Sequence, residues 1–325
     1  LSHYRVLPDD VMISYDLLRQ GAQLVRGTST KYALVGAINK DEQINLGKDL
    51  LRGCELIGAA THATIQDASG CSRAVRQFNQ RCALAVYVAT LRLIEAFHPE
   101  IIAITTITTT PVLATADTNV GAQKTGAVWE ACDHIINNML PRGNRNAIRR
   151  EIFTWTRECQ DTMEEFQEMI NMGPRKDVGG DVEEDGFDEE LYTEDELPIA
   201  RACLGLLKNS RGNMKIALET CESLGERANE TQEEKYLEAI VMVHEYARKV
   251  GEGVTDLGSL MYPPLIPPSK NLESETRKQA GFIREFQDYI LALESMPTAI
   301  SELAHTLQSA AETREREFLA ACLMK

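Results

Sequence analysis

Apolar residues recur three and four positions apart along most of the chain, the spacing that places them on one face of an α-helix. The most regular stripe consists of Leu237, Ile240, His244, Ala247, Gly251, Val254 and Gly258. Three of these residues, Ala247, Gly251 and Gly258, are small enough to let a neighbouring helix approach closely. We expect His244 on the same stripe to be a buried histidine rather than a metal ligand.

The same periodicity, read between breaks at Gly, Pro and Asn, predicts nine helices. In chain order they cover about 9–38, 41–66, 71–97, 121–140, 144–171, 198–224, 231–258, 271–295 and 298–324. Thr231 and Glu234 have the spacing of a capping box at the start of one of them. Because the connections are short, we predict an all-α fold of two up-and-down helical bundles, about five helices and then about four. Residues 101–118, rich in Ile and Thr, are the exception, and a mixture of helix and loop is expected there.

A strongly acidic stretch divides the chain. Residues 177–196 contain eleven carboxylates and no Lys or Arg, whereas the whole chain of 325 residues has a net charge of −15. Low hydrophobicity and like charge do not offset the entropy lost when a segment becomes ordered. We therefore predict an N-terminal helical bundle over 1–172, an acidic flexible linker over 173–190 and a C-terminal helical bundle over 191–325.

Charge, hydropathy and cysteine spacing exclude several classes of protein. Outside the acidic stretch the net charge is close to zero, which disfavours direct binding of nucleic acid through bulk charge. The longest uncharged run, 101–116, is too short and too polar to cross a membrane. The eight cysteines show no Cys-x-x-Cys spacing, so we expect free, buried thiols in a reducing compartment.

Few residues have a spacing that suits catalysis. The pairs Glu95/His98 and Glu302/His305 have the Glu-x-x-His spacing of two-metal sites on helices, and a metal-dependent helical enzyme is one hypothesis. However, the two pairs fall in different predicted bundles, and a chain with six His contains such pairs by chance. The sequence also lacks a phosphate-binding loop and a Gly-x-Ser-x-Gly elbow. We therefore expect no enzymatic activity, no cofactor and no metal.

A short basic stripe lies at the start of the fifth expected helix. Arg142, Arg145 and Arg149 would share one helix face, and no acidic residue lies between them. Such a stripe is either an ordinary solvated face or a docking site for an acidic segment, including the linker of the same chain. These three arginines are candidate partner-binding residues.

The junction between the acidic stretch and the next helix gives the second candidate site. Phe187 and Leu191 are four residues apart, so one helical turn would bring their side chains together among carboxylates. Such a segment can dock an apolar ridge into a groove while its charge steers the partner. Tyr192 and Thr193 suit phosphorylation in an acidic context. We predict that these four residues bind a partner; the alternative is an acidic spacer between the bundles.

Three motifs in a fixed order resemble a known family. They are Val128-Trp129-Glu-Ala131-Cys132, then Leu191-Tyr192-Thr-Glu194-Asp195-Glu196 leading into Cys203-Leu204-Gly-Leu206-Leu207, then Val254-Thr-Asp256-Leu257 running to Tyr262-Pro263-Pro264. Over about 70–268 they resemble the cyclin-D1-binding protein 1 family, also called the Grap2- and cyclin-D-interacting protein family. The resemblance implies a helical, non-enzymatic protein of the nucleus and cytoplasm. It also implies binding to D-type cyclins and helix-loop-helix transcription regulators, whose output the family dampens.

Two functional hypotheses follow. The first is a non-enzymatic helical adaptor with protein partners, in which Trp129 and Tyr262 are structural. Direct DNA recognition is not part of it, because no basic region precedes a dimerising helix pair. The second is a vinculin- or talin-like cytoskeletal scaffold, which rests on the analogy between helical bundles alone.

Overall fold

The computed structural model describes residues 7–35, 38–66, 69–98, 118–137, 140–174, 191–231, 233–266, 269–294 and 296–323. Within these ranges the chain forms nine helices and no strand, and 86% of the described residues are helical. The predicted all-α fold class is therefore confirmed. Residues 101–117 and 175–190, for which we expected mixed structure and an acidic linker, lie outside the described residues.

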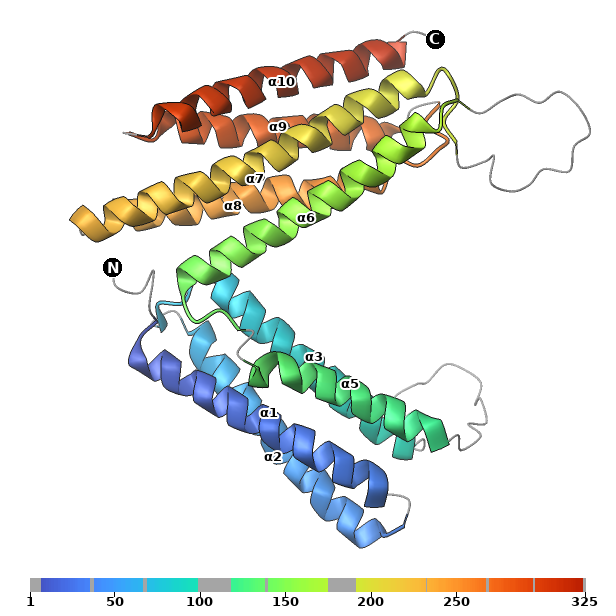
Figure 1. Cartoon of the computed structure of the whole chain (residues 1–325), viewed down its shortest axis with the longest axis vertical. Helices are drawn as coiled ribbons and strands as arrows, with labels where there is room; N and C mark the ends of the chain where they lie inside the picture. Colours follow the sequence, from blue (N-terminus) through green and yellow to red (C-terminus); the bar gives the residue numbers. More distant parts are fainter. Residues whose placement is uncertain are drawn as a thin grey trace, which may run out of the picture. The chain divides into compact units, whose positions relative to one another are not determined.

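Packing divides the chain into two compact units, Ser2–Ile148 (the N-terminal unit) and Arg149–Lys325 (the C-terminal unit). The N-terminal unit holds α1 (Asp9–Val35), α2 (Lys40–Ile65), α3 (Arg73–Phe97) and α5 (Thr118–Ile136) (Figure 1). Each of α1 and α3 packs against both α2 and α5, so the four helices surround one core. Leu18, Leu50 and Leu93 are fully buried in that core.

Glycines let α1 and α2 approach closely within the N-terminal unit. A Cβ atom on Gly21 would lie 2.7 Å from the backbone oxygen of Gly53, and one on Gly53 would lie 2.6 Å from Cγ2 of Val25. A larger residue at either position would force the two backbones apart. The starts of α2 and α3 are capped by Asn39 and Ser72, whose side chains accept hydrogen bonds from free backbone N–H groups of the first turn.

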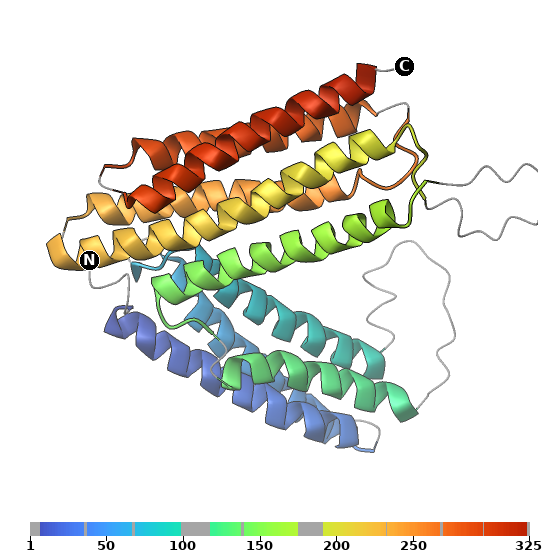
Figure 2. The same ribbon diagram turned by 45° about the horizontal axis from the view of Figure 1, so that its top comes forward.

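The C-terminal unit contains most of α6 (Asn144–Asn171) and four further helices. These are α7 (Leu197–Thr231), α8 (Lys235–Gly258), α9 (Lys270–Ala292) and α10 (Thr298–Leu323). Each of α8 and α10 packs against both α7 and α9, and the four run in up-and-down order (Figures 1 and 2). Leu206, Ile216 and Phe286 are fully buried in their core.

The small residues predicted on the α8 stripe are contacted by α6. A Cβ atom on Gly251 would lie 2.6 Å from Cγ of Trp155, and one on Gly258 would lie 2.9 Å from Cγ2 of Thr162. The expectation that small residues on this stripe permit close helix approach is confirmed. His244 is also buried, as predicted, with its Nε2 2.9 Å from Oε2 of the equally buried Glu151 on α6.

A layer of polar side chains crosses the core of the C-terminal unit. Nε2 of Gln279 on α9 donates hydrogen bonds to Oγ of Ser210 (2.7 Å) and to the carbonyl oxygen of Val250 (2.9 Å). About two helical turns further along α9, Gln287 donates a hydrogen bond to Oδ1 of Asn213. Because a one-residue slip would leave these buried groups unpaired, the layer fixes the register of α9 against α7 and α8.

Two details of the helices differ from the sequence-based expectations. Helix α7 runs to Thr231, so Thr231 does not cap the next helix; its hydroxyl donates to the carbonyl oxygen of Arg227, and Glu234 precedes α8 without a side-chain cap. The expected N-terminal bundle ended at residue 172, whereas packing assigns α6 from Arg149 onwards to the C-terminal unit. The reason is that the apolar face of α6 fits the small-residue stripe of α8.

All eight cysteines are free, and most are buried. Burial raises the pKa of the Cys132, Cys159 and Cys203 thiols to about 12. At pH 8 we expect these three to react with iodoacetamide roughly a thousandfold more slowly than in the unfolded chain, because the thiolate is the nucleophile. Mass spectrometry of chains alkylated with and without denaturant measures this ratio. Equal rates in the two states would contradict the prediction.

Candidate functional site

The segment that leads into α7 is anchored in the core. Tyr192 is fully buried, and its hydroxyl donates a 2.7 Å hydrogen bond to the carbonyl oxygen of Met261. Desolvation by burial raises the pKa of Tyr192 well above its ordinary value. The segment therefore packs against the loop between α8 and α9, and this packing sets where α7 begins.

Glu196 is the second anchor of this segment. Its side chain is buried, and Oε1 accepts hydrogen bonds from the backbone N–H groups of Leu265 (2.6 Å) and Ile266 (3.1 Å). Its Oε2 accepts a third, 2.9 Å long, from the N–H of Thr193. Three N–H groups thus compensate one buried carboxylate, which ties the start of α7 to the 261–266 loop.

The four predicted partner-binding residues of this region differ in how far they are exposed. Leu191 is half-buried, Tyr192 is buried in the core, and Thr193 is exposed, while Phe187 lies outside the described residues. The buried ring and bonded hydroxyl of Tyr192 leave it no surface to offer a partner in this conformation. Thr193 is accessible for modification, so its role stays a prediction.

The three candidate arginines already have interactions. Arg149 is half-buried and lies 3.4 Å from a carboxylate oxygen of Glu222 on α7. Arg142 is exposed and Arg145 half-buried, and neither is free of partners. An acidic segment that docked on this stripe would therefore have to displace existing contacts. The assignment of these residues to partner binding stays a prediction.

Among the described residues, the Glu-x-x-His pairs considered for metal binding have no additional metal-binding side chains grouped with them. Glu95/His98 lies at the end of α3 and Glu302/His305 lies in α10. Over the described ranges no three His, Cys, Asp or Glu side chains are grouped so that they could hold a metal ion. In the same part of the chain no helix combines the length and the apolar character needed to span a membrane.

An apolar stripe on the outer face of α3 was missed by the sequence analysis. Leu84, Val88 and Leu91 have 61%, 37% and 52% of their surface exposed, and their spacing of four and three places them on one helix face. The exposed Arg81 and Arg92 flank the stripe. The available signal was that α3 carries apolar residues on both faces, with Val86 and Leu93 buried on the other side.

The two aromatic residues expected to be structural connect neighbouring elements, Trp129 from a helix and Tyr262 from the loop between α8 and α9. Nε1 of Trp129 on α5 donates a 3.2 Å hydrogen bond to Oγ1 of Thr30 on α1, and the Arg26 guanidinium lies 5.1 Å from its ring centre. The Tyr262 hydroxyl donates a 2.6 Å hydrogen bond to Glu165 on α6. Both side chains remain partly exposed, at 37% for Trp129 and 49% for Tyr262, while tying elements together.

Comparison with known proteins adds one match. Residues 17–172 match the family model described as "Grap2 and cyclin-D-interacting, N-terminal". The match contains the Val128–Cys132 motif and begins well before residue 70, so the likeness reaches further toward the N-terminus than the motifs alone indicated. No curated protein matches the chain.

Proposed function

We propose that the chain, whose residues 17–172 match the Grap2 and cyclin-D-interacting family, is a non-enzymatic helical adaptor that binds a D-type cyclin. The apolar stripe of α3 supports this proposal, since it lies inside the family-matched region. In the proposal the adaptor lowers the activity of its partner in the nucleus and cytoplasm. Helix-loop-helix regulators are the second class of protein partner.

The α3 stripe has the properties of a docking surface. Leu84, Val88 and Leu91 form an apolar line over about two helical turns of α3, inside the family-matched region. Burying such residues against a partner removes apolar area from water, and the flanking arginines supply the polar rim. The stripe would then pack against an apolar groove of the partner.

The test is a binding measurement with the double variant Leu84→Asp/Leu91→Asp. Two carboxylates on the stripe are expected to weaken binding of a D-type cyclin at least tenfold, because they would be desolvated at the interface. Titration calorimetry with purified cyclin measures the affinity. Thermal unfolding should change little, since both leucines are mostly exposed.

Leu34→Asp is the matched control, because it places the same charge on a leucine that is 69% exposed outside the stripe. Equal affinities for the stripe variant, the control and the unmodified chain would reject the α3 surface. Failure of the unmodified chain to bind any cyclin would reject the proposed partner. The same titration with a helix-loop-helix regulator tests the second partner class.

The segment 187–193 and the arginine stripe remain alternative binding sites within the same proposal. Thr193→Glu imitates the charge of phosphorylation at an exposed position, and the triple variant Arg142→Gln/Arg145→Gln/Arg149→Gln removes the stripe. If either variant loses cyclin binding while the α3 variant still binds, the binding site is the segment 187–193 or the arginine stripe instead of the α3 surface. The family match does not favour the cytoskeletal scaffold, which co-sedimentation with actin tests directly.

A further inference from the structure

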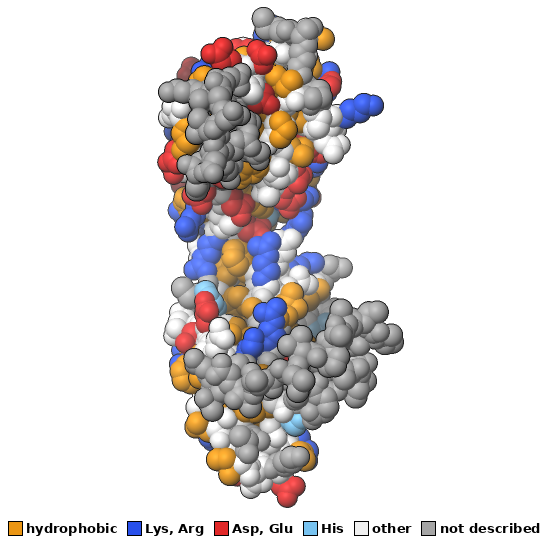
Figure 3. All heavy atoms as spheres, turned by 90° about the vertical axis from the view of Figure 1, so that its right-hand side faces the viewer, with side chains coloured by type: hydrophobic (Ala, Val, Ile, Leu, Met, Phe, Trp, Pro, Cys, Tyr) orange, Lys and Arg blue, Asp and Glu red, His pale blue; other side chains and the backbone are white. Residues whose placement is uncertain are grey.

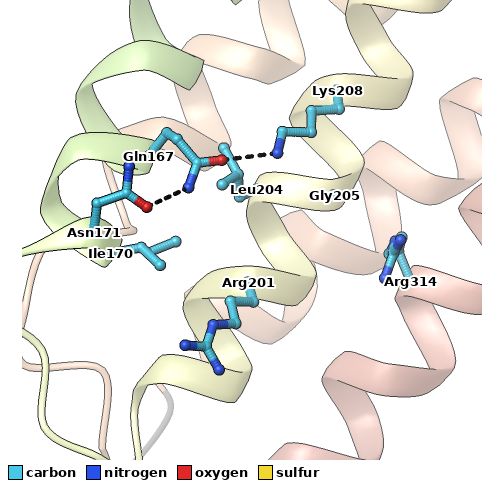
Figure 4. Close-up of a pocket in the computed structure, with 8 residues that line it drawn as sticks. All are labelled: Gln167, Ile170, Asn171, Arg201, Leu204, Gly205, Lys208 and Arg314. Atoms are coloured by element: carbon cyan, nitrogen blue, oxygen red, sulfur yellow. Dashed lines mark hydrogen bonds between the residues drawn. The ribbon is translucent and has the colours of Figure 1, made fainter. Parts of the chain in front are cut away.

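A pocket between α6, α7 and α10 lies entirely within the C-terminal unit (Figure 4). Its volume is about 320 Å³. The lining residues are Gln167, Ile170, Asn171, Arg201, Leu204, Gly205, Lys208 and Arg314. Three of them are cations and none is a carboxylate, which predicts a preference for anions.

The three cations of this pocket differ in their partners. Acidic side chains are frequent on the part of the C-terminal unit that Figure 3 shows, yet Arg201 has no ion-pair partner among the described residues. Lys208 is held by a neutral group, since its Nζ donates a 2.9 Å hydrogen bond to Oε1 of Gln167. Only Arg314 is paired with a carboxylate, 2.6 Å from Oε2 of Glu317.

Gly205 shapes the floor of the pocket. A Cβ atom at this position would lie 2.5 Å from Cδ of Arg314, so the arginine side chain crosses α7 directly over the glycine. This arrangement brings a cation from α10 to the same pocket as Arg201 and Lys208 of α7 (Figure 4). Two helices therefore contribute cations to the lining of this pocket, and a segment with several carboxylates could contact more than one of them.

We propose that this pocket binds carboxylate side chains of the chain's own acidic segment, residues 177–190. The charges are complementary, because this segment contains acidic residues and no Lys or Arg. Its two ends are also close to the pocket along the chain. Helix α6 ends at the pocket residue Asn171, the chain is described as far as Pro174, and it is described again from Leu191, ten residues before Arg201.

Tethering favours this occupant over a separate acidic protein. Asp177 is six residues from Asn171, a stretch that spans at most about 20 Å when extended. A segment joined to its site by so short a connection has an effective concentration on the order of millimolar. A weak carboxylate–guanidinium interaction is then sufficient for occupancy, and a free acidic peptide would need a much higher affinity to compete.

This docking site differs from the arginine stripe predicted from the sequence. Arg149 is engaged with Glu222, and Arg142 and Arg145 also have partners, whereas Arg201 is exposed and unpaired among the described residues. If the acidic segment docks in the pocket, neutralising the pocket cations should release it. If it docks on the arginine stripe, neutralising Arg142, Arg145 and Arg149 should release it instead. The proposal is also independent of the α3 stripe, so either can fail without the other.

The test measures how fast the full chain is cleaved within the acidic segment by a protease specific for Glu, whose sites there include Glu183 and Glu189. We expect the variant Arg201→Gln/Lys208→Gln/Arg314→Gln to be cleaved at least fivefold faster than the unmodified chain. Arg142→Gln/Arg145→Gln/Arg149→Gln is the matched control and should be cleaved at the unmodified rate. A synthetic peptide of residues 175–191 gives the rate without docking.

Three results would overturn the proposal. These are equal cleavage of the pocket variant and the unmodified chain, faster cleavage of the control variant alone, or an unmodified chain cleaved as fast as the peptide. Thermal unfolding checks that the variants are folded, and Arg201→Gln alone replaces the triple variant if that one unfolds. Added salt should accelerate cleavage of the chain relative to the peptide, because it screens the exposed charges.

Discussion

Replacing Glu196 by Ala is expected to lower the free energy of unfolding by about 3–5 kcal/mol. The carboxylate is buried and accepts hydrogen bonds from the backbone N–H groups of Thr193, Leu265 and Ile266. Alanine would leave these donors without an acceptor in a region that water enters poorly. Urea unfolding of the unmodified and variant chains, followed by circular dichroism, measures the difference.

Glu194→Ala and Asp195→Ala are the controls, because both side chains are exposed neighbours of the same charge. Each is expected to change stability by less than about 0.5 kcal/mol. Glu196→Gln should fall between Glu196→Ala and the unmodified chain, since its amide oxygen can still accept some of the hydrogen bonds. A Glu196→Ala variant as stable as these exposed-site controls would show that the three hydrogen bonds contribute nothing.

The helices were predictable because most of the relevant information is local. Apolar periodicity and breaks at Pro, Gly and Asn placed eight of the nine helix starts within three residues of those observed, and the start of α8 within four. The position of α6 was not predictable in the same way. Its periodicity shows that one face is buried, but it cannot tell which helices bury that face. The small residues of the α8 stripe were visible in the sequence, whereas the identity of α6 as the helix that contacts them was not.

The burial of the candidate site residues could not be predicted from local sequence either. Tyr192 and Glu196 lie in an acidic stretch that local composition describes as solvated, yet both are buried by contacts with the 261–266 loop, about 70 residues away in the chain. Long-range pairing of this kind leaves no local pattern. The exposure of the α3 stripe was missed for the opposite reason. Leu84 and Leu91 have the local pattern of core residues, and only the packing of α3 shows that they are exposed.

Gly251→Val is expected to destabilise the C-terminal unit by about 3 kcal/mol. A Cβ atom at this position would lie 2.6 Å from Cγ and 2.8 Å from Cβ of Trp155, and the rigid indole cannot give way without moving α6. The same displacement would disturb the buried contact between His244 and Glu151, which joins the same two helices. Thermal unfolding followed by circular dichroism and by tryptophan fluorescence reports the loss.

The matched control is Gly281→Val, because a Cβ atom on Gly281 of α9 meets no atom within 4 Å. Valine there should change stability by less than about 0.5 kcal/mol, since its helix propensity slightly exceeds that of glycine. Trp155→Ala removes the obstructing ring, so in its background Gly251→Val should cost much less than in the unmodified chain. Equal costs in both backgrounds would mean that the close approach of α6 to α8 does not depend on this glycine. A cost that disappears with the indole would instead establish that the small-residue stripe of α8 holds α6 in place.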